Sequence, residues 1–385
     1  MSNIKIMTGV TPDKKNIVSV IAKVQYNVDK NGQCHLISVQ SELNEELEYY
    51  DNIKYKGRIQ PSLLKKDLDV YPFKDKTDLV VQGTIRTQKP QKNLEIKLSC
   101  KGTKFHFDHV VSVTGNRFID KSFSNPIISE PEIFTEIPMR YDNAYGGTDE
   151  RAESLNTDLK ELELIRSVVG EEEDKEISEY SYPRNPSGKG YLVAPEGLIG
   201  TSLPNLEFPK ERLNIDNMIL PLNKWHLRPY PACFDWFPHA WFPRVAFFGD
   251  YPDTHDDRTP QKEFELGILD ENFAKIPLIE RPKYGFSQGA HPFLWRFRLD
   301  GNELITINKM AKDGNDFIVC LPNHIPKIKL SISSKMFKKL KPVLDYVFIE
   351  TEKNQISLLW RASLIFKKKI LTNDILQNCS YKIKW

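Results

Sequence analysis

The distribution of proline limits what the middle of this chain can fold into. Residues 126–260 contain fifteen of the 25 prolines in the 385-residue sequence, together with many aromatic residues. Proline removes a backbone hydrogen-bond donor, which bars it from central strand positions and from the interior of helices. We therefore expect residues 126–260 to form an ordered loop segment that is held together by aromatic packing and side-chain hydrogen bonds.

The segments on either side of this centre show the alternation that is typical of β-strands. In residues 94–100, LEIKLSC, apolar and polar side chains alternate, and after a Lys-Gly-Thr turn the apolar positions resume. This pattern predicts a hairpin with one buried face. The pair Asp300-Gly301 predicts a second hairpin, because Asp-Gly fits a tight turn between strands. The Glu-Lys-Asn sequence at 352–354 predicts a third.

The expected fold class is mainly β. Two β-sandwich-like regions, residues 1–125 and 261–385, would be joined by a proline- and aromatic-rich loop segment, residues 126–260, with one or two short helices. Leucines near helical spacing predict one helix in residues 153–170, within an acidic insertion at 150–178. The second short helix is expected at residues 333–345.

Composition excludes several classes of protein. The net charge of +2 gives no overall attraction to nucleic acid or membrane. Charge is nevertheless uneven: residues 149–179 carry a balance of −8, and residues 327–384 carry +9. The five cysteines show no CxxC spacing, so we expect no disulfide framework, no zinc site and no cofactor. Without a signal sequence or a long apolar run, a cytoplasmic, soluble protein is expected.

Few residues suggest catalysis. The stretch NPSGKGY at 185–191 lacks the first glycine and the final hydroxyl of a phosphate-binding loop. The Asp250–Asp257 loop, with His255, offers oxygen and nitrogen ligands, and a metal-dependent hydrolase is the alternative function that it would support. Cys233 and His239 could form a nucleophile and base, but their aromatic surroundings favour a packed cysteine. We expect no catalytic constellation and no metal site.

An aromatic cluster lies at residues 225–242. Tryptophan and tyrosine beside arginine are enriched in protein–protein hot spots, whereas the same residues can equally form the core beneath a loop region. Carbohydrate binding through exposed tryptophans is a further alternative. The candidate partner-binding residues are Trp225, Tyr230, Phe234, Trp236, Trp241 and Arg244.

Five segments, in order, resemble the motifs of one family. They are RYDNAYGGTD at 140–149, YPRNPSGKG at 182–190, LPNLEFP at 203–209, WFPR at 241–244 and IETEKNQISLLWRA at 349–362. The chain is similar, over roughly residues 10–365, to a domain-of-unknown-function family (family 2169) found beside type VI secretion effectors. The insertion at 150–178 separates two motifs that usually lie closer together.

The resemblance implies a non-enzymatic adaptor or chaperone. Such a protein binds a toxic effector, which can carry a PAAR domain, and helps to load it on a spike of the valine-glycine-repeat class. We expect most of the motif residues to build the central scaffold through arginine–carboxylate pairs and turn geometry, with Gly146 and Gly147 as backbone requirements. These scaffold residues are Arg140, Asp142, Gly146, Gly147, Thr148, Asp149, Tyr182, Arg184, Asn185 and Pro186.

Overall fold

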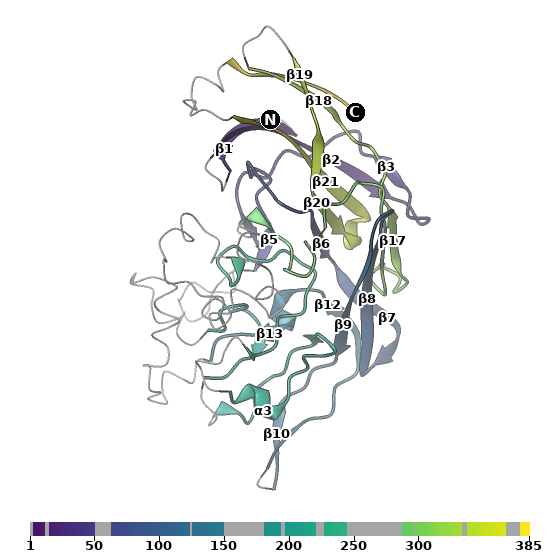
Figure 1. Cartoon of the computed structure of the whole chain (residues 1–385). Helices are drawn as coiled ribbons and strands as arrows, with labels where there is room; N and C mark the ends of the chain where they lie inside the picture. The colour runs from purple at the N-terminus through teal and green to yellow at the C-terminus, as the bar shows by residue number, and fades with distance from the viewer. Residues whose placement is uncertain are drawn as a thin grey trace.

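The structure is a computed structural model of the whole chain (Figure 1). The residues that it describes are 3–11, 15–50, 63–123, 125–149, 181–193, 197–220, 227–244, 287–295, 297–332, 337–366 and 378–385. The predicted helix at 153–170 and the acidic insertion lie outside these ranges. Within them the protein is mainly β, as the sequence predicted.

A six-stranded sheet joins the two ends of the chain. Its order is β1 (Ile4–Val10), β2 (Asn16–Val28), β21 (Gln355–Phe366), β20 (Pro342–Glu350) and β6 (Asp78–Gln82), with β3 (Cys34–Leu36) paired to β2. All pairs are antiparallel except β20 with β6. The predicted hairpin at residues 352–354 is confirmed, and its turn closes through Asn354 in the left-handed conformation.

A five-stranded sheet also combines distant segments. Its order is β15 (Leu206–Glu207), β9 (His106–Thr114), β8 (Asn93–Lys101), β16 (Leu304–Ile307) and β17 (Phe317–Cys320). The hairpin predicted in residues 94–113 is confirmed as β8 and β9, with Ile96, Leu98 and Cys100 buried. Residues 1–125 and 261–385 therefore contribute strands to the same two sheets, and the predicted ranges do not correspond to separate sheets.

The hairpin predicted at Asp300-Gly301 is wrong. Gly301 does turn the chain at φ +91°, but β16 pairs with β17 and β8 instead of with residues before the turn. The carboxylate of Glu303 accepts hydrogen bonds from the backbone N–H groups of residues 300–302, which stabilises an isolated turn. An Asp-Gly pair specifies the turn, and it does not specify which strands meet across it.

The short helix predicted at 333–345 is also wrong. The described part of this range forms β19 (Lys338–Leu340) and the start of β20, where Pro342 lies at the first strand position. β19 belongs to a three-stranded sheet with β18 (Lys327–Ser331) and β22 (Ser380–Lys384). Leu340 is buried opposite Ile328 of β18, as the pairing of two strands requires.

The central segment consists mostly of loops and two-stranded ribbons, within the ranges that the structure describes. The two-stranded ribbons of the described ranges are β4 (Glu48–Tyr49) with β5 (Leu64–Lys66), β7 (Thr84–Gln91) with β12 (Phe134–Pro138), β10 (Ile119–Ser122) with β11 (Asn125–Ile128), and β13 (Tyr145–Gly146) with β14 (Lys189–Gly190); β4, β5, β7 and β10 precede the central segment and pair with it or with each other. One α-helix, α3 (Ile215–Met218), is described there. One large apolar core runs from both sheets into this segment.

Candidate functional site

The motif RYDNAYGGTD begins with a charged turn. Residues Tyr141–Asn143 form a short 3-10 helix, η1, and Arg140 forms a two-pronged ion pair with Asp142 at its start. The Arg140 guanidinium also lies over the ring of Tyr50, 5.2 Å from its centroid. A bidentate arginine–carboxylate pair fixes orientation as well as supplying energy. The first predicted strut of the scaffold is therefore present.

The glycine pair that follows meets the second motif at very short range. Gly146 and Gly147 have φ values of +145° and +110°. A Cβ atom on Gly146 would lie 2.1 Å from the carbonyl oxygen of Asn185, and one on Gly147 would lie 2.6 Å from that of Gly188. The Asn185 side-chain amide donates to the carbonyl oxygens of residues 141 and 145, at 2.8 and 3.0 Å. The glycines are thus required by the close approach of two backbones.

Arg184 is held by aromatic and backbone groups. It is buried, and its guanidinium donates to the Tyr182 hydroxyl and to the carbonyl oxygen of Arg228, both at 3.2 Å. The same guanidinium stacks over the Tyr230 ring, 3.8 Å from the centroid. Burial raises the pKa of Tyr182, so its hydroxyl remains a protonated donor to the Pro229 carbonyl. A cation over a desolvated aromatic ring is a strong packing element.

The end of the first motif forms one wall of a shallow groove of about 360 Å³. Thr148 bonds to the Ser181 hydroxyl and to the carbonyl oxygen of Pro186, and Asp149 accepts from the backbone N–H of Val193. Lys189 bonds to the amide oxygens of Asn143 and Asn205, and burial lowers the pKa of its ammonium. The groove is therefore lined by glycine backbone and by polar side chains that are hydrogen-bonded to other groups of the same chain.

The aromatic candidates lie in the core. Tyr230, Phe234, Trp236, Trp241 and Arg244 are all buried, and Trp225 lies outside the described residues. Trp236 packs edge-on against Tyr346, and Trp241 packs edge-on against Tyr141. Of the two interpretations that the sequence allowed, the structure supports a core beneath the loops. These five side chains do not form a surface that a partner could contact.

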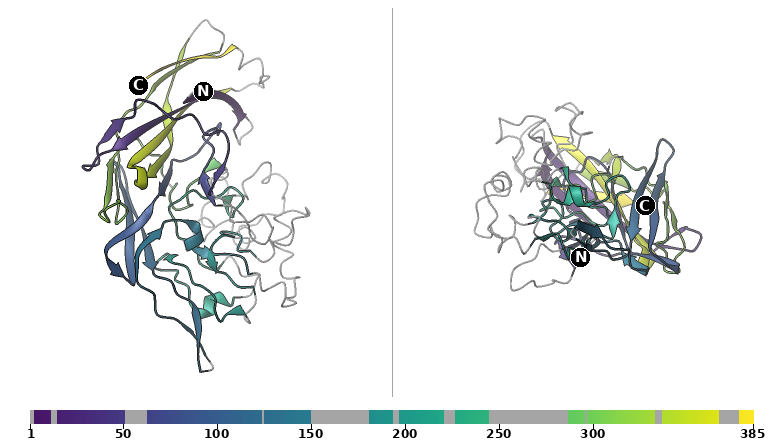
Figure 2. Two further views of the ribbon diagram at one scale, coloured as in Figure 1. Left: turned by 180° about the vertical axis from the view of Figure 1, so that it is seen from behind. Right: turned by 90° about the horizontal axis from the view of Figure 1, so that it is seen from below.

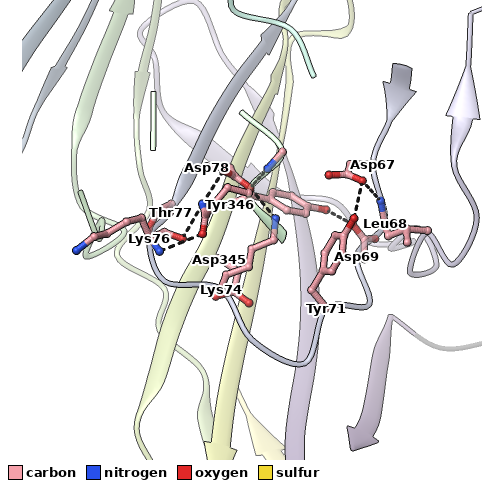
Figure 3. Close-up of polar contacts among 12 residues, drawn as sticks. Asp67, Leu68, Asp69, Tyr71, Lys74, Lys76, Thr77, Asp78, Asp345 and Tyr346 are labelled. Carbon is pink, nitrogen blue, oxygen red and sulfur yellow. Dashed lines mark hydrogen bonds and ion pairs between the residues drawn. The ribbon is translucent and has the colours of Figure 1, made fainter. Parts of the chain in front are cut away.

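A buried polar network, which sequence reasoning missed, surrounds residues 67–78 (Figure 3). Lys74 and Asp78 are fully buried, and their charged atoms lie 2.6 Å apart. Asp69 accepts from the Tyr346 hydroxyl and from Lys23, each at 2.8 Å. Breaking one buried pair leaves the other charge uncompensated, which is strongly destabilising. The only signal in the sequence is a run of charges immediately before a buried strand.

Arg244 of the WFPR motif completes this network. Its guanidinium pairs with Asp67 and donates to the Tyr71 hydroxyl at 3.0 Å, and Tyr71 in turn donates to Asp67. Burial raises the pKa of Tyr71, so the phenol remains protonated and able to donate. These contacts fasten the aromatic loop to the segment that leads into β6. Arg244 therefore acts as a structural anchor instead of a partner contact.

A cavity of about 260 Å³ opens beside this network. Lys23 pairs with Asp69 in its wall, and Lys353 pairs with Glu350 at 2.7 Å. These charged side chains in the cavity wall thus form ion pairs with other side chains of the protein. Nearby, burial raises the pKa of Asp235 to about 7, although its carboxylate accepts hydrogen bonds from Gln82 and Tyr50.

The catalytic alternatives gain nothing from the described residues. The Asp250–Asp257 loop, with His255, lies outside them, and among the residues described no group of three or more His, Cys, Asp or Glu side chains could hold a metal ion. Cys233 is buried, and burial raises its pKa well above the usual value, so the thiol stays protonated.

In the same described ranges, no helix is long and apolar enough to cross a membrane.

A hairpin with exposed apolar side chains projects from the molecule where the central segment begins (Figures 1 and 2). It consists of β10 and β11, and Phe123 at its tip is 98% exposed. The register places Phe118 and Ile127 on the face opposite the buried Ile119, and both are exposed. Phe123 has a φ of +54°, a left-handed conformation that is strained for a bulky side chain.

Comparison with known proteins identifies a family. No curated protein and no solved structure matches the chain. The profile of a bacterial family, described as "Uncharacterized protein conserved in bacteria (DUF2169)", matches residues 13–361. That range includes both scaffold motifs and the polar network, and it confirms the family that the motifs resembled. The chain therefore belongs to the DUF2169 family of bacterial proteins.

Proposed function

We propose that this protein is a cytoplasmic adaptor or chaperone of type VI secretion. It would bind a toxic effector and help to load it on a spike of the valine-glycine-repeat class with a PAAR tip. Family membership and the resemblance of its motifs support the setting. The exposed apolar hairpin β10–β11 is the structural observation that carries the proposal.

The hairpin has the features of a binding element. Three exposed apolar side chains, Phe118, Phe123 and Ile127, lie on this one short element, whereas a single exposed apolar residue needs no explanation. Phe123 makes the argument stronger, because glycine or asparagine would adopt φ +54° with less strain. A phenylalanine in this position, almost fully exposed, therefore serves something outside the hairpin. An effector with an apolar surface is the partner that the proposal assigns to it.

The motif residues support a role without catalysis. Each motif side chain makes its contacts within the protein. Arg140 forms an ion pair at a turn, Arg184 stacks on an aromatic ring, and Asn185 donates to two backbone carbonyls. They belong to a rigid base that Asn205 links to the end of β9, the strand that precedes the hairpin: its backbone N–H donates to the Asn143 carbonyl, and its side-chain amide donates to the Thr114 carbonyl. A rigid base reduces the entropy that is lost when a partner binds.

Affinity capture from the native host tests the proposal. We expect the tagged wild-type chain to recover a toxin and a spike component. The variant Phe123→Asn should recover much less toxin, because asparagine keeps the left-handed turn and removes the apolar contact. Val39→Ser is the matched control, since Val39 is also highly exposed, at 82%, but lies elsewhere. Recovery of neither component by the wild-type chain would refute the adaptor function.

A further inference from the structure

The outer face of the three-stranded sheet carries five lysines. In β18, Lys327 and Lys329 are exposed while Ile328 and Leu330 are buried against the six-stranded sheet. The register places Lys384 opposite Lys327. It also places Lys339 and Lys382 on either side of Lys329. Alternation therefore directs all five charges, Lys327, Lys329, Lys339, Lys382 and Lys384, to the face that points away from the core.

This arrangement is unfavourable for the protein alone. Like charges directly opposite each other on adjacent strands destabilise a sheet. Strands β18, β19 and β22 contain no acidic residue, and within the described part of the chain no ion pair involves any of the five lysines. A surface that serves only solubility usually mixes both signs of charge. The face is therefore suited to an anionic partner.

We propose that this lysine face binds an acidic, extended polypeptide segment of a partner protein. Along a strand, alternate residues lie roughly 6.7 Å apart, and the lysine rows repeat at this spacing. An extended segment with carboxylates at alternate positions has the same repeat, so several ion pairs form in register. Among the strands that the structure describes, β19 and β22 lie at the edges of this sheet, where such a segment can also add as a strand.

A polypeptide fits this face better than a nucleic acid does. Single-stranded nucleic acids bind to platforms where bases stack on open aromatic rings. Here Phe337 precedes β19, and the ammonium of Lys382 lies over its ring, 4.4 Å from the centroid, which covers it with a cation. The face also has lysines alone, without the arginine forks that recognise phosphate bidentately.

The lysine face and the apolar hairpin lie at opposite ends of the molecule (Figures 1 and 2). One chain can therefore hold two partners without steric conflict. The positive charge of the face follows from the sheet itself and does not depend on any effector. Its role as the second contact of an adaptor rests on the proposed function. The acidic segment would then belong to the partner that the hairpin does not hold.

Fluorescence anisotropy with a labelled synthetic peptide that alternates Glu and Thr tests the binding. The full chain should bind it, with affinity that falls as salt increases. The variant K327Q/K329Q/K382Q/K384Q should bind on the order of tenfold more weakly. The control K30Q/K65Q/K89Q/K101Q removes the same charge from exposed lysines elsewhere and should bind as the wild type does.

Three results would overturn the assignment: no peptide binding by the wild type, equal weakening by both variants, or tighter binding of a DNA duplex or of phosphatidylserine vesicles than of the peptide. The variants must first show wild-type circular dichroism. Toxin capture by the wild type with failed peptide binding would refute this inference alone. Peptide binding with failed toxin capture would refute the proposed function alone.

Discussion

At the scale of single residues, the two motifs depend on positions where no side chain fits. Gly146→Ala should destabilise the protein by roughly 3 kcal/mol, because the new Cβ meets the Asn185 carbonyl oxygen in a strained conformation. Urea unfolding followed by tryptophan fluorescence would measure this. Gly200→Ala is the control: its φ is +83°, but no atom lies within 4 Å of the new Cβ, so strain alone should cost about 1 kcal/mol. Equal losses would show that the close backbone approach is absent.

Asp235 should make stability depend on pH. Burial raises its pKa from 3.8 to about 7 in the folded state, so the folded protein holds a proton that the unfolded chain has released. Stability should therefore fall as pH rises from about 4 to 7, by about 1.4 kcal/mol per unit at most. In Asp235→Asn this contribution should vanish, since the amide can accept from Gln82 and donate to Tyr50. Parallel stability profiles for both proteins between these pH values would contradict the assignment.

Some of these residues could be predicted from sequence and others could not. Gly146 and Gly147 were identifiable because adjacent glycines among polar residues indicate an unusual backbone. The ion pair between Asp67 and Arg244 could not be predicted. Its partners are 177 positions apart, and the sequence around each gives no sign of the other. The contacts of Arg184 with the Tyr230 ring and a backbone carbonyl could not be predicted either, because they join separate segments of the chain.

At the scale of elements, repulsion between the lysines of the three-stranded sheet should lower the stability of the protein. Lys329→Gln should stabilise the protein by about 0.2–1 kcal/mol at low salt, because Lys339 and Lys382 lie directly opposite. Thermal unfolding at low and high salt would measure this, and salt should reduce the gain. Lys101→Gln, which faces His106 and Leu304, should change little. A loss of stability in Lys329→Gln would show that the lysines do not repel one another.

The same scale shows where strand patterns are informative. β8 and β9 were predictable because apolar and polar residues alternate in both and a short turn joins them. β19 was misassigned as a helix because three residues are too few to show alternation, and the leucine fits either period. The pairing of β16 with β8 connects residues about 200 positions apart, and no local signal encodes such a pairing.

At the scale of the whole molecule, the fold separates two surfaces of different chemistry. Strands from both ends of the sequence share two sheets, and one large apolar core joins them, with a separate apolar cluster beneath the three-stranded sheet. The termini and the lysine face lie at one end, and the apolar hairpin lies at the other (Figure 1). A rigid body with an apolar contact at one end and a cationic contact at the other suits a protein that brings two partners together.

Export of the captured toxin by the native host tests the adaptor function most directly. In a strain that lacks this protein, we expect toxin to disappear from the culture medium while remaining in the cells. Wild type and Val39→Ser should restore export, and Phe123→Asn should not, at equal cellular amounts of each protein. Undiminished export in the deletion strain, or full restoration by Phe123→Asn, would contradict an adaptor that holds its effector through this hairpin.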